Sequence, residues 1–215
     1  MKLLIEQSEQ DIECLVENTS QGKQYFLEGR WATANEANKN GRIYPSRVME
    51  GALQKYNETH ITQRRALGEL NHPPGPTVNL DRASHIIENL KMEGNYVVGR
   101  AKVMNTPMGV IAKNLIDEGV KLGVSTRGLG SLVSKNGLNE VQGDFFISAI
   151  DLVSDPSGPG CFPAGVIAES IDYQLLEDGR IIELVVDSAK KRIDEKKAMK
   201  AFAQLMLEHS KKYQN

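Results

Sequence analysis

Three side chains of the types that cooperate in nucleophilic hydrolysis lie in short segments rich in glycine or proline. Ser125 lies in KLGVSTRGLGSL, where glycines allow the backbone to approach a reacting atom closely. His72 lies in LNHPPGP, where prolines stiffen a loop, and Asp151 lies in a predicted strand. A serine hydroxyl is a weak nucleophile unless a neutral imidazole accepts its proton, and that imidazole needs an orienting partner. These residues could form such a set, although a turn serine and a packing histidine remain the alternative.

Other kinds of site fit the sequence less well. No GxxxxGK[ST] motif is present, and GLGSLV lacks the third glycine of a dinucleotide-binding fingerprint. The four histidines show neither HxxxH nor HExxH spacing, so we expect no metal site and no cofactor. Ser125 is not part of a GxSxG elbow, because Arg127 stands where the second glycine would be.

The composition is typical of a soluble globular protein. Of the 215 residues, 40% are hydrophobic and 25% are charged, and the net charge of −2 leaves no basic footprint for nucleic acid. No apolar run approaches the ~18 residues of a membrane span, and MKLLIEQSEQDIE turns acidic too early for a signal peptide. Cys14 and Cys161 lack CxxC spacing and are expected to be packing residues. We therefore expect a cytosolic protein that binds neither nucleic acid nor a membrane.

Hydrophobic periodicity predicts a mixed α/β arrangement with few helices. SRVMEGALQKYNETH is expected to be a helix with Ser46 as its N-cap. A second helix is expected between the cap residue Thr106 and the terminating Gly119. Alternating residues on both sides of Glu93–Asn95 predict two strands joined by a turn.

The sequence is acidic and polar near its N-terminus and charged near its C-terminus. We expect an N-terminal tail at residues 1–22, a folded domain at 23–170 and a charged C-terminal tail at 171–215. The last of these ends in a predicted amphipathic helix from Ser188 onward, which could dock on another protein or pack within the chain.

Three segments together resemble a known family. NKNGRIYP (38–45), LGELNHP (67–73) and GVSTRGLGS (123–131) are similar, in order and spacing, to the prohead core proteases of contractile-tailed bacteriophages. The resemblance covers roughly residues 25–160 and extends into AIDLVSDPSGPG. It implies a serine endopeptidase with a mixed α+β fold like that of herpesvirus assemblin, with a compact, barrel-like, mostly antiparallel sheet and a few surrounding helices.

The resemblance also implies a setting and partners. Such proteases work inside the immature prohead in the host cytoplasm, where they cleave scaffold or core proteins and capsid proteins and then cut themselves. These proteins would be the partners of this chain, which could also form a homo-oligomer. The alternative is a non-catalytic core or scaffold protein with the same fold, and a general esterase is a weaker third reading. A Ser125–His72 distance of about 2.6–3.2 Å would favour the enzyme.

Carried over motif by motif, the resemblance assigns roles to individual residues. His72 would be the general base and Ser125 the nucleophile. Arg127, by side chain or main chain, and the backbone at Gly128 would help to form the oxyanion hole and contact substrate. In NKNGRIYP, the residues expected to form a turn and pack beneath the site are Asn38, Asn40, Gly41 and Tyr44.

The third catalytic group is open at this point. Asp151 is the first choice, although in related capsid proteases the acid can lie two residues earlier, where this chain has Ala149. His85 is a rival, because the herpesvirus enzymes use a second histidine. Asp81 and Glu69 are further alternatives.

Proteases of this class prefer to cut after glutamate with Leu or Ile two residues before it. The sequence holds ten such glutamates, where chance predicts about three. Strand patterning that puts Leu and Glu two residues apart on one face could also raise this count. Because proteolysis needs locally unfolded backbone, we expect self-cleavage in the tails. The candidate sites are Glu6, Glu17, Glu169, Glu177, Glu183 and Glu195.

Overall fold

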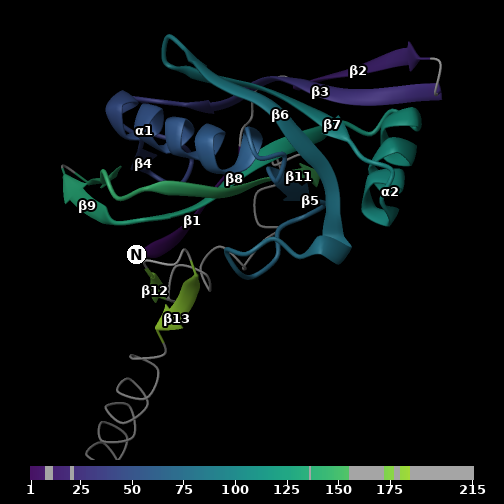
Figure 1. Cartoon of the computed structure of the whole chain (residues 1–215). Helices are drawn as coiled ribbons and strands as arrows, with labels where there is room; N and C mark the ends of the chain where they lie inside the picture. The colour runs from purple at the N-terminus through teal and green to yellow at the C-terminus, as the bar shows by residue number, and fades with distance from the viewer. Residues whose placement is uncertain (8–11, 20–21, 136, 155–171, 177–179, 185–215) are drawn as a thin grey trace, which may run out of the picture.

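The computed structural model describes residues 1–7, 12–19, 22–135, 137–154, 172–176 and 180–184 (Figure 1). Within them lie the helices α1 (Ser46–Tyr56) and α2 (Pro107–Asp117), a π-helical turn η1 (Asn57–Ile61) and a 3-10 turn η2 (Leu80–Arg82). The strands are β1 (Lys2–Gln7), β2 (Ile12–Thr19), β3 (Gly22–Thr33), β4 (Arg42–Ile43), β5 (Leu67–Glu69), β6 (Ala83–Glu93), β7 (Tyr96–Val103), β8 (Leu122–Gly130), β9 (Leu132–Lys135), β10 (Leu138–Val141), β11 (Phe146–Ser154), β12 (Asp172–Leu175) and β13 (Ile181–Leu184).

The strands form mostly antiparallel sheets, which confirms the predicted mixed α+β class. One five-stranded sheet has the order β11-β8-β1-β12-β13, and a second has the order β2-β3-β7-β6-β5. A small third sheet, β4-β10-β9, contains the parallel pair β4 and β10. The likeness to herpesvirus proteases stays a prediction.

The first sheet places three residues of the candidate active site close together. Strand β8 lies between β1 and β11, so that Ser125 is opposite both Gln7 and Asp151. Directly opposed residues of neighbouring strands project to the same face, and so do residues two apart on one strand. Ser125, Arg127 and Asp151 therefore share one face of the sheet.

The loop after β5 is fastened to this sheet. Leu70 forms a bridge with Leu152 of β11, and the Asn71 N–H donates to the Leu152 carbonyl at 2.7 Å. Asn71 has a φ of 69°, a left-handed conformation that asparagine tolerates better than most residues. This turn places His72 over β11.

The helices cover the sheets from two sides. Helix α1 packs against β11 and β6 through Met49, Leu53 and Tyr56, and α2 packs against β6 and β7 (Figure 1). Thr106 caps α2 as predicted, accepting from the Gly109 N–H at 3.2 Å. Ser46 does not cap α1: Pro45 holds the cap position and Ser46 is already helical.

The N-terminal stretch expected as a tail instead supplies two strands. The apolar patches LLIE and CLVE are too short to stand out in the sequence, yet they form β1 and β2. Strand β1 pairs with β8, which is distant in the chain, and β2 pairs with the next strand, β3. Cys14 of β2 is exposed, so it is not the packing residue expected. At the other end, β12 and β13 form a hairpin, whereas the helix predicted from Ser188 lies outside the described residues.

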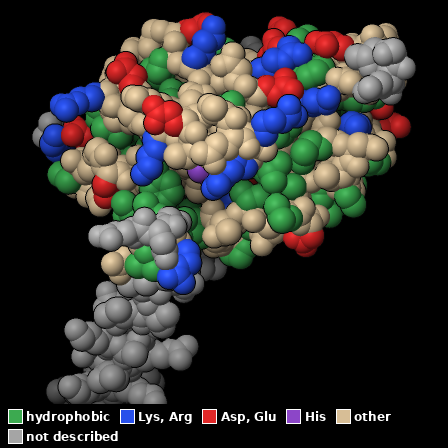
Figure 2. Space-filling view, viewed as in Figure 1, with side chains coloured by type: hydrophobic (Ala, Val, Ile, Leu, Met, Phe, Trp, Pro, Cys, Tyr) green, Lys and Arg blue, Asp and Glu red, His purple; other side chains and the backbone are tan. Residues whose placement is uncertain are grey.

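The viewed surface carries mixed charges. Basic and acidic side chains are interspersed over it, without a face of one sign (Figure 2). Among the described residues, no helix has the length and apolar character needed to traverse a bilayer.

Candidate active site

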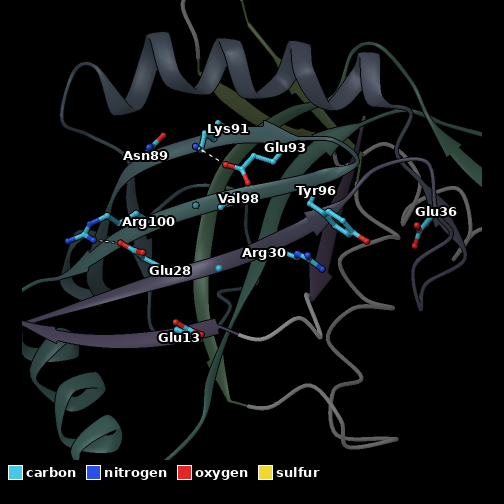
Figure 3. A pocket seen from close by; sticks show the side chains of 12 residues that line it. Glu13, Glu28, Arg30, Glu36, Asn89, Lys91, Glu93, Tyr96, Val98 and Arg100 are labelled. Atoms are coloured by element: carbon cyan, nitrogen blue, oxygen red, sulfur yellow. Dashed lines mark hydrogen bonds and ion pairs between the residues drawn. The ribbon is translucent and has the colours of Figure 1, made fainter.

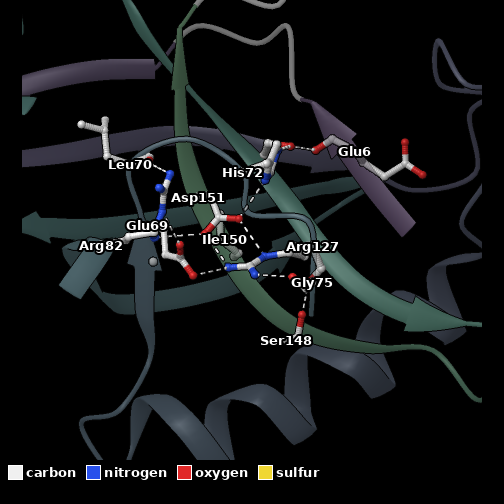
Figure 4. Close-up of polar contacts among 12 residues, drawn as sticks. Glu6, Glu69, Leu70, His72, Gly75, Arg82, Arg127, Ser148, Ile150 and Asp151 are labelled. Atoms are coloured by element: carbon white, nitrogen blue, oxygen red, sulfur yellow. Dashed lines mark hydrogen bonds and ion pairs between the residues drawn. The ribbon is translucent and has the colours of Figure 1, made fainter. Parts of the chain in front are cut away.

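His72, in the loop after β5, points toward Asp151 of β11 (Figure 4), and its ring also contacts Ser125 of β8. The Ser125 Oγ lies 2.5 Å from the His72 Nε2, and the His72 Nδ1 lies 2.9 Å from the Asp151 Oδ2. Ser125 and Asp151 are fully buried, while the His72 side chain keeps 15% of its surface exposed. The structure thus brings together the three residues that the sequence singled out.

The contacts of the His72 ring fix which nitrogen can act as a base. An ionised carboxylate only accepts hydrogen bonds, so the Nδ1 facing Asp151 carries the proton of that bond. In the neutral ring, Nε2 is then the basic nitrogen, and it faces the Ser125 hydroxyl. This is the arrangement that a general base requires.

Asp151 is buried but ionised. Burial opposes its charge, yet the His72 hydrogen bond and the Arg127 guanidinium outweigh burial and hold the pKa of Asp151 below its ordinary value. Its Oδ1 accepts from the Glu69 backbone N–H at 3.0 Å. The carboxylate therefore stays charged next to the ring that it orients.

Arg127 lies behind Asp151, and its side chain is fully buried. Two of its N–H groups bind Asp151, one binds Glu69, and Nη1 binds the carbonyls of Gly75 and Thr77. These contacts use all five guanidinium donors. The side chain thus has no donor left for an oxyanion, so the expectation that it helps to form the oxyanion hole is wrong. A contribution from the Arg127 main chain stays a prediction.

Gly128 has a packing role in this structure. A Cβ at this position would lie 2.6 Å from the Phe145 ring and from the Phe146 carbonyl. Only glycine therefore fits here without a shift of β11 or its neighbours. Its contribution to an oxyanion hole also stays a prediction.

Glu69, at the end of β5, balances the charge of Arg127. It is fully buried, and its carboxylate accepts from Arg127, Arg82 and Asn79. Glu69 does not contact the His72 ring, so it is not the third member. The sequence did offer a hint of this role, because Glu69 lies among the apolar residues of ALGEL. A carboxylate buried among such residues needs a buried cation as its partner.

His85 is a core residue in β6 and does not contact His72. Its Nε2 donates to the Ile150 carbonyl at 2.9 Å, and its Nδ1 accepts from Ser84 at 2.9 Å. Burial lowers the pKa of His85 to about 4, so the ring is neutral. Ala149 is buried opposite Arg127, and Asp81 lies in the turn η2. Asp151 is the group that the structure places on His72.

One predicted self-cleavage residue lies in the site. The Ser125 hydroxyl donates to the backbone carbonyl of Glu6 in β1 at 2.8 Å. Glu17 lies exposed in β2, paired with Arg100 at 3.0 Å, and Glu183 lies in β13. The remaining candidates, Glu169, Glu177 and Glu195, lie outside the described residues.

The turn segment NKNGRIYP does more than pack beneath the site, which corrects the sequence interpretation. Asn38, Asn40, Arg42 and Tyr44 all donate hydrogen bonds to the side chain of Glu6. Sequence reasoning missed this role, because the partner lies more than 30 residues away in the chain. The sequence offered one hint of this role, namely the many side-chain hydrogen-bond donors within the short segment NKNGRIYP.

A surface hollow lies elsewhere, on the outer face of the second sheet (Figure 3). Its charges are largely paired, since Arg100 bonds Glu17, Glu28 and Glu88 and stacks on Phe26. It contains no serine, cysteine or histidine. Among the described residues, no group of three or more acidic, histidine or cysteine side chains is placed to hold a metal ion.

Comparison with known proteins agrees with the resemblance that the three motifs indicated. The prohead core protein protease of Enterobacteria phage T4 is 40% identical over 139 residues, which span 62% of this chain and 65% of that protein. The solved bacteriophage T4 capsid assembly protease shares the fold, with a TM-score of 0.67 and 35% identity over 72% of this chain and 98% of that one. A family model described as prohead core protein serine protease matches residues 6–172. This chain belongs to the prohead core protein serine protease family.

Proposed function

We propose that this chain is a serine endopeptidase in which Ser125 is the nucleophile, His72 the general base and Asp151 the orienting acid. The observation that carries the proposal is the pair of contacts that His72 makes, to the Ser125 Oγ at 2.5 Å and to the Asp151 Oδ2 at 2.9 Å. Membership of a serine protease family supports it.

The chemistry follows from these contacts. The Ser125 Oγ attacks the carbonyl carbon of the scissile bond while its proton passes to the His72 Nε2. Asp151 stabilises the imidazolium, which then protonates the leaving amine as the C–N bond breaks. Water releases the acyl group by the same steps in reverse. Backbone N–H groups near Arg127 and Gly128 are the proposed donors to the oxyanion.

The proposed substrates are core, scaffold and capsid proteins inside the immature prohead. The name of the phage T4 relative, a prohead core protein protease, supports this assignment. We place the cut after glutamate with Leu or Ile two residues before it, and we include the chain itself among its substrates. The excess of such glutamates in the sequence supports this preference.

Intact-mass spectrometry tests the activity directly. Wild-type protein is incubated with full-length Ser125→Ala chain as substrate, and Ser125→Ala alone is the matched control. We expect fragments of the substrate that end at glutamates, and none from the control. Loss of the serine or the histidine in such a set typically costs more than about 10⁴-fold in rate.

The same experiment decides against the non-catalytic alternative. If the wild type leaves the substrate whole, purified core and capsid proteins are added. A wild type that still cuts nothing is a structural core protein. Equal cutting by wild type and Ser125→Ala would assign the activity to a contaminant and remove Ser125 as the nucleophile.

A further inference from the structure

Glu69 is the last residue of β5, where the chain crosses from the second sheet to the first. The pairing of β5 with β6 slips by one residue between Gly68 and Glu69, and bulges of this kind often re-aim a side chain next to an active site. The next residue, Leu70, already forms a bridge with Leu152 of β11. Glu69 therefore lies at the junction of the two sheets, and it is fully buried there.

The Glu69 carboxylate closes the loop that carries His72. Its Oε1 accepts from the Asn79 backbone N–H at 2.8 Å, and Asn79 follows Glu69 by ten positions in the chain. Its Oε2 accepts from the Arg82 Nε at 3.2 Å, just beyond the end of the loop (Figure 4). The loop thus starts at the main chain of Glu69 and returns to its side chain. One residue holds both ends of the loop.

Arg127 holds the middle of the same loop. Its Nη1 donates to the Gly75 carbonyl at 2.6 Å and to the Thr77 carbonyl at 3.2 Å. Its Nη2 donates to the Glu69 Oε1 at 3.2 Å, and both side chains of this ion pair are fully buried. A buried cation requires a buried counter-charge, which Glu69 supplies together with Asp151. The loop is therefore folded around a buried ion pair.

Asp151 is bound by the same two residues. Its Oδ1 accepts from the Glu69 backbone N–H and from the Arg127 Nη2, both at 3.0 Å. Its Oδ2 accepts from the Arg127 Nε at 2.9 Å and from the His72 Nδ1 at 2.9 Å. The guanidinium thus lies between two carboxylates, and it shares one oxygen of Asp151 with the imidazole ring.

Removal of the Glu69 charge would change this balance. Charges are poorly screened in a buried site, so Arg127 would then be attracted to Asp151 alone. Because Arg127 and His72 bind the same oxygen, a stronger contact with Arg127 weakens the hydrogen bond to the ring. A glutamine at position 69 would also leave the loop less well closed, since its NH₂ group would face the Arg82 Nε, a donor against a donor.

We propose that Glu69 is a positioning residue of the candidate active site, which acts through Arg127 and through the closed loop to keep the Asp151 carboxylate on the His72 ring. The proposal deepens the proposed protease function and rests on it. Glu69 is not a catalytic residue in this account, because its contacts are to Arg127, Asp151 and the loop rather than to the reacting atoms.

Steady-state kinetics of Glu69→Gln test the role in catalysis. The substitution keeps the size of the side chain and removes its charge. We expect kcat for a peptide containing Leu-Ile-Glu to fall at least about tenfold, with KM within about twofold of the parent. Glu88→Gln is the matched control, because it makes the same change in a 41% exposed carboxylate paired with Arg100, and kcat should stay at the parental value. A parental kcat in Glu69→Gln would overturn the proposal.

A double variant tests whether Glu69 acts through Arg127. Two residues that act through one contact give losses that do not add. We expect kcat of the chain with both Glu69→Gln and Arg127→Lys to lie within about threefold of the slower single variant. A loss equal to the product of the two single losses would show that Glu69 acts independently of Arg127, against the proposal.

Proton NMR provides a readout that requires no cleavage. In the full chain carrying Ser125→Ala, the Nδ1 proton of His72 gives a downfield resonance that reports its hydrogen bond to Asp151. We expect Glu69→Gln to move this resonance upfield or to broaden it, and Glu88→Gln to leave it in place. The spectra are recorded at a temperature where circular dichroism shows the folded state.

An unchanged resonance in folded Glu69→Gln would overturn the proposal, even if the variant has a lower Tm, because the role of Glu69 would then be structural only. If Glu69→Gln does not fold, Glu69→Asp is used. It keeps the charge but is one methylene shorter, so we expect a smaller shift in the same direction, and no shift would count equally against the proposal. Failure of the protease function would leave the NMR result unaffected, so the two outcomes are distinguishable.

Discussion

Arg127 holds both carboxylate oxygens of Asp151, with Nε 2.9 Å from Oδ2 and Nη2 3.0 Å from Oδ1. Such a two-point contact fixes the plane of a carboxylate as well as its position. The same guanidinium binds the carbonyls of Gly75 and Thr77, in the loop that follows His72. One buried side chain therefore fixes both the acid and the loop that presents the base.

Arg127→Lys is expected to impair kcat much more than KM. A lysine keeps the charge but has one donor centre in place of the planar fork, so Asp151 can rotate away from His72. We expect kcat for a Leu-Ile-Glu peptide to fall at least about tenfold, with KM within about twofold of the parent. Steady-state kinetics with circular dichroism as a folding check measure this. Equal losses in kcat and in folded fraction would mean a purely structural role.

Local sequence patterns were enough to pick out the candidates, whereas their roles came from the family resemblance of their motifs, which left the third member open. Each lies in a segment whose glycines, prolines or strand alternation restrict it to a surface or a sheet face, and such constraints are visible in a few neighbouring residues. The helix cap at Thr106 and the turn at Glu93–Asn95 were predictable for the same reason.

Contacts between distant segments could not be predicted in this way. Arg127 was expected near the oxyanion, because nothing within its motif shows that Asp151 and Glu69 surround it. Strand β1 was expected to be a tail, because six residues form a strand only when β8 offers a partner. Both features depend on contacts between residues more than 20 positions apart. The local pattern of apolar and polar residues does not show which distant segments pair.

Asp151→Asn is expected to remove nearly all activity without unfolding the protein. The amide can donate to His72 Nδ1, which favours the tautomer with the proton on Nε2, and that nitrogen then no longer accepts from Ser125. We expect kcat to fall by roughly 10³–10⁴-fold. Rates on the Leu-Ile-Glu peptide, at a temperature where the variant is folded, measure this. Retention of a tenth of the activity would require a different third group.

His85 makes stability depend on pH. Its pKa is lowered by burial to about 4, below the ordinary value of about 6.5, so the folded state favours the neutral ring. The unfolded chain then binds more protons between these two values. Stability is therefore complete above about pH 6.5 and falls by roughly 3 kcal/mol as the pH drops to about 4. Urea unfolding at pH 7 and pH 4.5 measures the difference.

His85→Gln is the matched variant for this effect. Glutamine does not titrate, yet it can donate to the Ile150 carbonyl and accept from Ser84. We expect the fall in stability between pH 7 and pH 4.5 to become smaller and kcat at pH 7 to stay within about threefold of the parent. A loss of activity as large as that of Asp151→Asn would instead identify His85 as a catalytic group.

Gly68→Ala is expected to destabilise the protein and disturb the site together. A Cβ at Gly68 would lie 2.0 Å from the Ile150 carbonyl and 2.3 Å from the His85 ring, and the Ile150 carbonyl cannot move without shifting β11 next to Asp151. Overpacking of this kind costs typically about 1–3 kcal/mol. Gly51→Ala is the control, because its Cβ meets nothing within 4 Å, and alanine in α1 should stabilise by up to about 1 kcal/mol. Thermal unfolding and peptide cleavage should therefore separate the two variants, and a Gly68→Ala protein with parental Tm would show that β5 and β11 are not tightly packed.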